Sequence, residues 1–219
     1  MNHLRALVAA ALLVTSGAQA AYVDYTAVIA AEDTYWSHSR TFSQFNPGAG
    51  VLTGVSFFLN VDLLTTFSGE NKGRRSATIT SRLDGSMEFG LPSGPVTLNF
   101  SDVLSKTVGA FDGTHDFAGS SGYTESVSQA LMRDVVAVNL ADFYGAGQFV
   151  VDVTADSWSR VTGAGNTVSK TANTAGASMT LRYSYVERAG AARHAVPEPG
   201  SLLLAGLALA GLALSRRRA

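Results

Sequence analysis

The 219-residue sequence contains no cysteine. This absence excludes disulfide bonds, cysteine nucleophiles, cysteine-ligated zinc and thioether-linked haem. An exported protein could use disulfides, so a cysteine-free domain must depend on the burial of its core for stability.

Other groups that carry chemistry are also scarce. Beyond the N-terminal segment the only histidines are His38, His115 and His194. No Gly-x-Ser-x-Gly elbow is present to hold the serine of a Ser-His-Asp triad. We therefore expect a protein that is not an enzyme and needs no cofactor. An enzyme acting on exopolysaccharide stays open as the least favoured alternative, because glycoside cleavage needs only two facing carboxylates.

The N-terminal segment resembles a targeting sequence in its order of charge and apolar residues. His3 and Arg5 precede an apolar stretch from Ala6 to Val14, and Ala18-Gln19-Ala20 follows. This order predicts a secretory signal peptide over residues 1–20, cleaved between Ala20 and Ala21. A first membrane helix would need a longer apolar run.

The C-terminal segment has three parts after a short linker at 189–195. Val196, Pro197, Glu198 and Pro199 form the first part, where two prolines prevent helix formation and leave an extended peptide that another protein could bind.

The second part is an uncharged apolar run, and the third is a block of positive charge. The run begins at Ser201 and Leu202 and ends at Leu214, which predicts a single transmembrane helix. At about 1.5 Å per residue the run covers about 20 Å of a hydrocarbon layer about 30 Å thick, so it would need flanking residues or a thinned bilayer. Arg216, Arg217 and Arg218 should stay on the cytoplasmic side.

The order of these three parts at residues 196–219 resembles the PEP-CTERM sorting signal of Gram-negative bacteria. The resemblance implies processing by exosortase, a membrane cysteine transpeptidase, and an association with exopolysaccharide. It also implies an inner-membrane precursor that is later displayed at the cell envelope surface or in the extracellular matrix. The function that we expect is a structural or adhesive component of the biofilm.

The body between these ends, residues 21–188, is mildly acidic, and together with the linker up to Val196 it has a net charge of about −4. It therefore has no basic surface of the kind that binds nucleic acid. Apolar and polar residues alternate through most of it, with Gly, Asn, Ser and Pro between the alternating segments. This pattern predicts an all-β domain, an antiparallel jelly-roll-like β-sandwich.

Specific strands follow from the alternation. Inward-facing sets are expected from six segments, and the longest keeps one apolar face at every second position from Val51 through Thr53 and Val55 to Leu63. The segment 125–144 is ambiguous: Val135 and Val136 favour a strand, while Asn139 could cap one helical turn through Tyr144.

A second resemblance extends over nearly all of the body. Residues 45–55, 111–122 and 143–147, together with Leu181-Arg182-Tyr183-Ser184-Tyr185, resemble the choice-of-anchor E domain family. That family joins an extracellular β domain to alternative anchoring signals, so the resemblance implies surface display and assigns no activity.

Two groups of residues are candidate sites in the body. Trp158 shares a strand face with Asp156, and Tyr35 lies in a second aromatic cluster, so these three are candidate glycan contacts of a binding module. The alternative is that Trp158 packs under a loop or along the rim of a sheet. Asp112 and Asp116 flank a glycine-containing loop and are candidate calcium ligands; the alternative is that they simply form turns.

Overall fold

The computed structural model describes residues 20–188, which form eight strands and one short 3-10 turn. The elements are β1 (Ala20–Asp33), β2 (Trp36–Ser43), β3 (Gly50–Asn71), β4 (Ala77–Leu91), β5 (Gly94–Val108), β6 (Gly122–Val136), η1 (Ala141–Phe143), β7 (Gln148–Thr162) and β8 (Thr167–Glu187). The expected leader, linker, sorting motif, membrane helix and arginine block lie almost wholly outside these residues. Between residues 20 and 188, no helix has the length and apolar character needed to cross a membrane.

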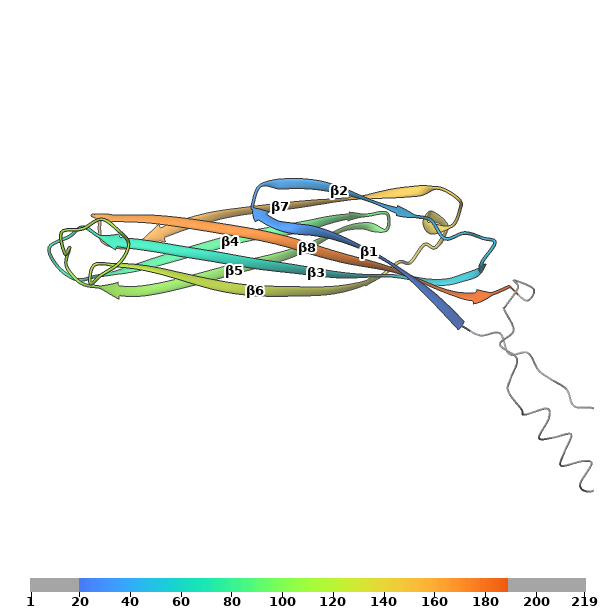
Figure 1. The fold of residues 1–219 in the computed structure, drawn as a ribbon, viewed down its shortest axis with the longest axis horizontal. Coiled ribbons are helices and arrows are strands. Elements are labelled where there is room, and N and C mark those ends of the chain that lie inside the picture. Colours follow the sequence, from blue (N-terminus) through green and yellow to red (C-terminus); the bar gives the residue numbers. More distant parts are fainter. Residues whose placement is uncertain (1–19, 189–219) are drawn as a thin grey trace, which may run out of the picture.

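The strands form two antiparallel sheets packed face to face (Figure 1). One sheet has the order β1-β8-β3-β6 and the other has the order β2-β7-β4-β5. Every connection except β4–β5 passes from one sheet to the other, which gives the strand order of an eight-stranded jelly roll. The predicted all-β sandwich is confirmed.

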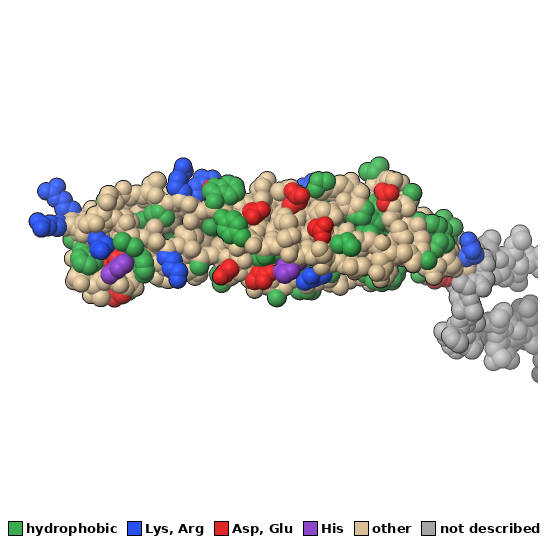
Figure 2. All heavy atoms as spheres, turned by 90° about the horizontal axis from the view of Figure 1, so that it is seen from above, with side chains coloured by type: hydrophobic (Ala, Val, Ile, Leu, Met, Phe, Trp, Pro, Cys, Tyr) green, Lys and Arg blue, Asp and Glu red, His purple; other side chains and the backbone are tan. Residues whose placement is uncertain are grey.

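The sandwich is a long rod because its central strands are unusually long (Figures 1 and 2). β3 has 22 residues, and at about 3.3 Å per residue it extends about 70 Å. Ala20 pairs with Val186, and Gly50 pairs with Glu187, so the first and last described strands meet at one end. The connections 72–76, 109–121 and 163–166 lie at the opposite end, which we call the distal end.

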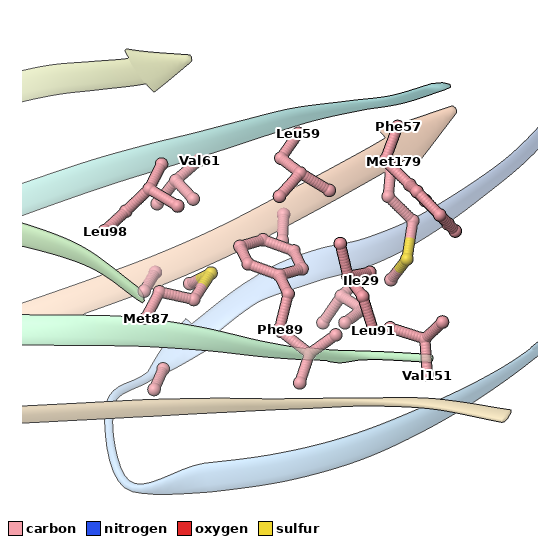
Figure 3. Close-up of a cluster of buried hydrophobic side chains, with 14 of the residues drawn as sticks. Ile29, Phe57, Leu59, Val61, Met87, Phe89, Leu91, Leu98, Val151 and Met179 are labelled. Atoms are coloured by element: carbon pink, nitrogen blue, oxygen red, sulfur yellow. The ribbon is translucent and has the colours of Figure 1, made fainter. Parts of the chain in front are cut away.

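The core follows the predicted alternation. Phe57, Leu59 and Val61 of β3 point toward Met87 and Phe89 of β4 (Figure 3), and all five side chains are buried. Burying each such side chain stabilises the fold by about 1.5–3 kcal/mol, which replaces the contribution that disulfides could have made.

One predicted face is wrong at the start of β3. Leu52 is buried, while Val51 is 59% exposed and Thr53 is also exposed. The register with β8 shifts between Leu52 and Gly54, and the resulting bulge adds one residue. Because side chains alternate with a period of two, one extra residue exchanges the faces on its two sides.

The ambiguous segment is a strand followed by a turn. β6 continues to Val136, and the single turn η1 is 3-10 rather than α. The Asn139 Oδ1 accepts a hydrogen bond from the Ala141 N–H at 3.2 Å, just before the turn. Phe143 is fully buried, so the turn closes this end of the core.

At the distal end, hydrogen bonds order the 109–121 connection. The Asp112 Oδ1 accepts the Thr114 N–H at 3.0 Å, and the Asp116 Oδ1 accepts the Ala118 N–H at 3.0 Å. The fully buried Glu70 carboxylate accepts the Phe117 N–H at 2.9 Å and the Ser121 hydroxyl. Glu70, near the end of β3, thus holds the second half of the 109–121 connection in place through two hydrogen bonds.

Replacing Gly85 by alanine should destabilise the sandwich. A Cβ at this position would lie 2.4 Å from the Phe100 ring and 2.5 Å from the Asp156 carbonyl oxygen. Overpacking of this kind costs about 1–3 kcal/mol, which urea unfolding of the full chain would measure. Gly165→Ala is the matched control, because nothing lies within 4 Å of its Cβ. Equal midpoints for the two variants would contradict the packing.

Asp112→Asn should weaken the acid sensitivity of the fold. The Thr114 N–H, followed by the Ser121 hydroxyl, lowers the pKa of the Asp112 carboxyl below its usual value. A pKa that is lower in the folded than in the unfolded protein means that the ionised carboxylate stabilises the fold above about pH 4. This stabilisation is lost as the pH falls through the pKa of the folded protein. The melting temperature of the variant should therefore fall less than that of the wild type between pH 6 and pH 2. Asp134→Asn controls for the loss of one exposed charge; the same acid response in both variants would refute the prediction.

Candidate functional site

The candidate site lies where β1 and β2, two of the four edge strands of the sandwich, end. β1 stops pairing with β8 at Asp33 and Thr174, and β2 starts pairing with β7 at Trp36 and Ala155. Beyond these positions, no strand among residues 20–188 pairs with β8 or β7 on this side. On one part of this flank β1 and β2 cover the edges of β8 and β7. Beyond the ends of β1 and β2 the edges of β8 and β7 are exposed.

A hollow of about 140 Å³ occupies this flank. It is bordered by Tyr35 and Trp158, which are 71% and 59% exposed. Its inner wall includes Leu83 of the core and the buried polar residues Ser157 and Asn173. Thr34, Ser159 and Thr171 complete the lining.

The connection between β1 and β2 is fixed over the hollow by four hydrogen bonds. The Thr34 N–H donates to the Asn173 carbonyl at 3.1 Å, and the Tyr35 N–H donates to the Ala155 carbonyl at 2.8 Å. The hydroxyls of Thr34 and Ser157 lie 2.6 Å apart, and the Tyr35 hydroxyl donates to the Ser157 carbonyl. The connection is thus attached to both sheets.

Tyr35 adopts a backbone conformation that is uncommon for its residue type. Its φ is +82°, in the left-handed region, where a residue with a side chain is strained by about 1 kcal/mol or more. The four hydrogen bonds of the connection hold this conformation in place. The strained backbone directs the Tyr35 ring along β7, where its hydroxyl reaches Ser157.

Asn173 is a buried amide with an unused donor. Its side chain is 6% exposed, and its Oδ1 lies 3.1 Å from the Thr65 hydroxyl oxygen. Its Nδ2 has no hydrogen-bond partner among residues 20–188. The Thr65 hydroxyl also lies 2.8 Å from the Asp102 carboxylate, which is buried too. A buried amide donor without a partner costs free energy that a bound acceptor would recover.

The exposed strand edges supply further polar groups. Backbone groups of a strand point to alternate edges, and the carbonyls of Ser157 and Asn173 point toward the β1–β2 connection. Ser159 and Thr171, each two residues away, therefore turn their backbone N–H and C=O groups to the same side. No strand within the described range covers these groups.

The candidate glycan residues are only partly brought together. Tyr35 and Trp158 border one hollow, although 122 residues separate Tyr35 from the adjacent Ser157. Asp156 is exposed on the same face of β7 as Trp158 but does not line the hollow. Trp158 is 59% exposed, which does not agree with packing under a loop, while the alternative of a position along the rim of the sheet stays open.

Two of the most important polar residues were missed from the sequence. Ser157 and Asn173 lie on inward-facing positions of β7 and β8, inside segments rich in Ser, Thr, Ala and Asn. Nothing in the sequence separates them from the many other hydroxyl and amide residues. Only the position at which β1 and β2 end distinguishes them.

The calcium candidates do not form a cluster. Asp112 and Asp116 each accept a hydrogen bond from the backbone N–H two residues ahead. This is the geometry of a turn, the alternative to a calcium site. Nowhere in residues 20–188 do three or more His, Asp or Glu side chains gather in a way that could hold a metal ion. His38 is placed beside the Glu32 carboxylate and against the Trp36 ring, at 5.2 Å between ring centres.

Comparisons with solved structures find only distant similarity. The chain is similar to a structure of the infectious bursal disease virus Gx strain, at 13% identity over 87% of this chain, with a TM-score of 0.18. It is also similar to the T13 particle of that virus, at 14% identity over 86% of this chain, with a TM-score of 0.17. The chain spans about half the length of these chains, 47% and 46%. The TM-scores are too low to bear on fold or function.

Comparisons by sequence concern the C-terminal segment. No curated protein matches the chain. The resemblance of the body to the choice-of-anchor E family receives no support from these comparisons. The family model that matches is described as the PEP-CTERM protein-sorting motif, and it covers residues 195–218. This motif indicates exosortase-dependent sorting of a membrane-anchored precursor to the cell surface.

Proposed function

We propose that this protein is a non-enzymatic structural or adhesive component of the cell surface or extracellular matrix, associated with exopolysaccharide. The observation that carries the proposal is the sorting motif at residues 195–218, joined to one end of a rod about 70 Å long.

The position of the chain ends in the rod supports display of the distal end. β8 ends at Glu187, beside the start of β3 and the start of β1, and the sorting motif follows eight residues later in the sequence. Any attachment made through the C-terminal segment therefore holds the rod by one end. The opposite end would extend away from that attachment.

The β3–β4 connection of the distal end carries positive charge, while Asp112 and Asp116 of the 109–121 connection at the same end are negative. Lys72, Arg74 and Arg75 lie in the β3–β4 connection and are exposed, and Figure 2 shows Lys and Arg side chains projecting from this end of the rod. None of the three takes part in an ion pair within residues 20–188. Such a group of cations attracts acidic polymers, and the attraction weakens as salt increases.

The sorting step predicts a specific mass for the mature protein. Mass spectrometry of the protein from its native cells should give a C terminus near Val196, without Arg216–Arg218. Replacing Pro197, Glu198 and Pro199 together by alanine should keep the arginines and retain the protein in the membrane fraction, because the extended site is lost. Glu88→Ala, at an exposed position of β4, should be processed as the wild type. An intact C terminus in the wild-type protein would overturn the sorting step.

Adhesion through the distal end predicts a charge-dependent affinity for acidic polysaccharide. Arg74→Gln with Arg75→Gln should lower retention of the full chain on immobilised alginate several-fold at low salt and little at high salt. Arg133→Gln with Arg188→Gln removes the same charge from the middle and the opposite end of the rod. Equal losses for both pairs would show that only net charge matters, and would refute a role for the distal end.

A further inference from the structure

We propose that the hollow bordered by Tyr35 and Trp158 binds one neutral pyranose ring of a saccharide. This inference deepens the proposed function, on which it rests for the source of the saccharide, by naming a site that recognises polysaccharide without using charge. The site lies on the flank of the rod, apart from the basic distal end.

Aromatic surface is the first requirement of such a site. A pyranose ring has an apolar C–H face that packs against an aromatic ring, while its hydroxyls point outward to polar groups. Trp158 and Tyr35 are exposed at the border of the hollow, and within the described chain neither packs against another aromatic ring. Their apolar surfaces are therefore available to a ligand.

Polar groups inside the hollow are the second requirement. The unpartnered Nδ2 of Asn173 needs an acceptor, and a sugar hydroxyl is an acceptor as well as a donor. The Thr65 hydroxyl has one proton, which the Asp102 carboxylate takes at 2.8 Å, so the Asn173 amide keeps one unpartnered polar group whichever way it is turned. The edge groups of Ser159 and Thr171 add backbone donors and acceptors at the same place.

The lining also determines the charge of the ligand. The described residues that border the hollow are aromatic, hydroxyl, amide or aliphatic, and none of them is ionised. A carboxylate or phosphate would enter without a cation to pair with, at a desolvation cost. A neutral hexose unit matches this lining, whereas acidic polymers match the distal end.

The hollow is already shaped in the unliganded protein. The four hydrogen bonds of the β1–β2 connection hold Tyr35 over β7, so little ordering is needed when a ligand binds. The Tyr35 hydroxyl donates its hydrogen bond to the Ser157 carbonyl, so this carbonyl is not available for pairing and the exposed edge of β7 is not continuous. A peptide adding as a further strand needs a continuous edge, so a ring-sized ligand fits better.

The test is a titration of the full chain in a zwitterionic detergent that has no sugar headgroup. The probes are methyl pyranosides of glucose, galactose, mannose and N-acetylglucosamine, followed by tryptophan fluorescence and saturation-transfer NMR. At least one probe should bind with a Kd in the millimolar range, because a single ring makes few contacts. Methyl glucuronide should bind at least about 10-fold more weakly than the best neutral probe, since the hollow offers no cation.

Variants separate the hollow from adventitious binding. Trp158→Ala should weaken the best probe at least about 10-fold, and Trp158→Phe should recover part of the affinity. Asn173→Ala should also weaken it, with melting temperatures recorded to show that the fold is kept. Tyr22→Ala removes an exposed aromatic on another part of the rod and should change nothing.

Two results would overturn the inference. One is no saturable binding of any neutral probe up to about 50 mM, well above the millimolar range expected for one ring. The other is binding that Trp158→Ala leaves unchanged. Neither result contradicts the proposed function. That proposal is contradicted by a different result, a mature protein that keeps Arg216–Arg218.

Discussion

The pairing of β3 with β8 is the interaction on which the rest of the structure depends. The two strands are hydrogen-bonded from Gly50 and Glu187 at one end to Asn71 and Thr167 at the other. They form the centre of their sheet, with β1 and β6 added at the edges. Their length sets the length of the rod, and a cysteine-free chain can maintain it because one side chain in two along β3 is buried.

The outer strands do not match the central strands in length, and the candidate site follows from this mismatch. β1 has 14 residues against 21 in β8, and β2 has 8 against 15 in β7. The two outer strands share one connection, so their ends expose both inner strands at the same point. A jelly roll with outer strands of full length would have covered Ser157 and Asn173 completely.

The sequence allowed prediction of the sandwich and of most buried positions, because both depend on a period of two that is readable in β4, β7 and β8. It did not reveal the bulge at Leu52–Gly54, since Val51 and Thr53 are as compatible with an inward face as Leu52 is. Trp158 was identified as a candidate contact from its place on a strand face with Asp156, and Tyr35 from its place in an aromatic cluster. Their position at one hollow depends on the strand register, which local patterns do not determine.

Two kinds of recognition can coexist on the rod because they depend on different physics. The exposed cations of the distal end act over distances near the Debye length, about 8–10 Å, and lose strength as salt increases. The hollow acts only at contact, through aromatic surface and an unpaired amide, and salt should change it little. A surface protein that meets polysaccharide in solutions of varying salt would therefore keep the contact-dependent part of its affinity when the charge-dependent part is screened. The flank site, rather than the charged end, would then determine which neutral sugars the rod retains.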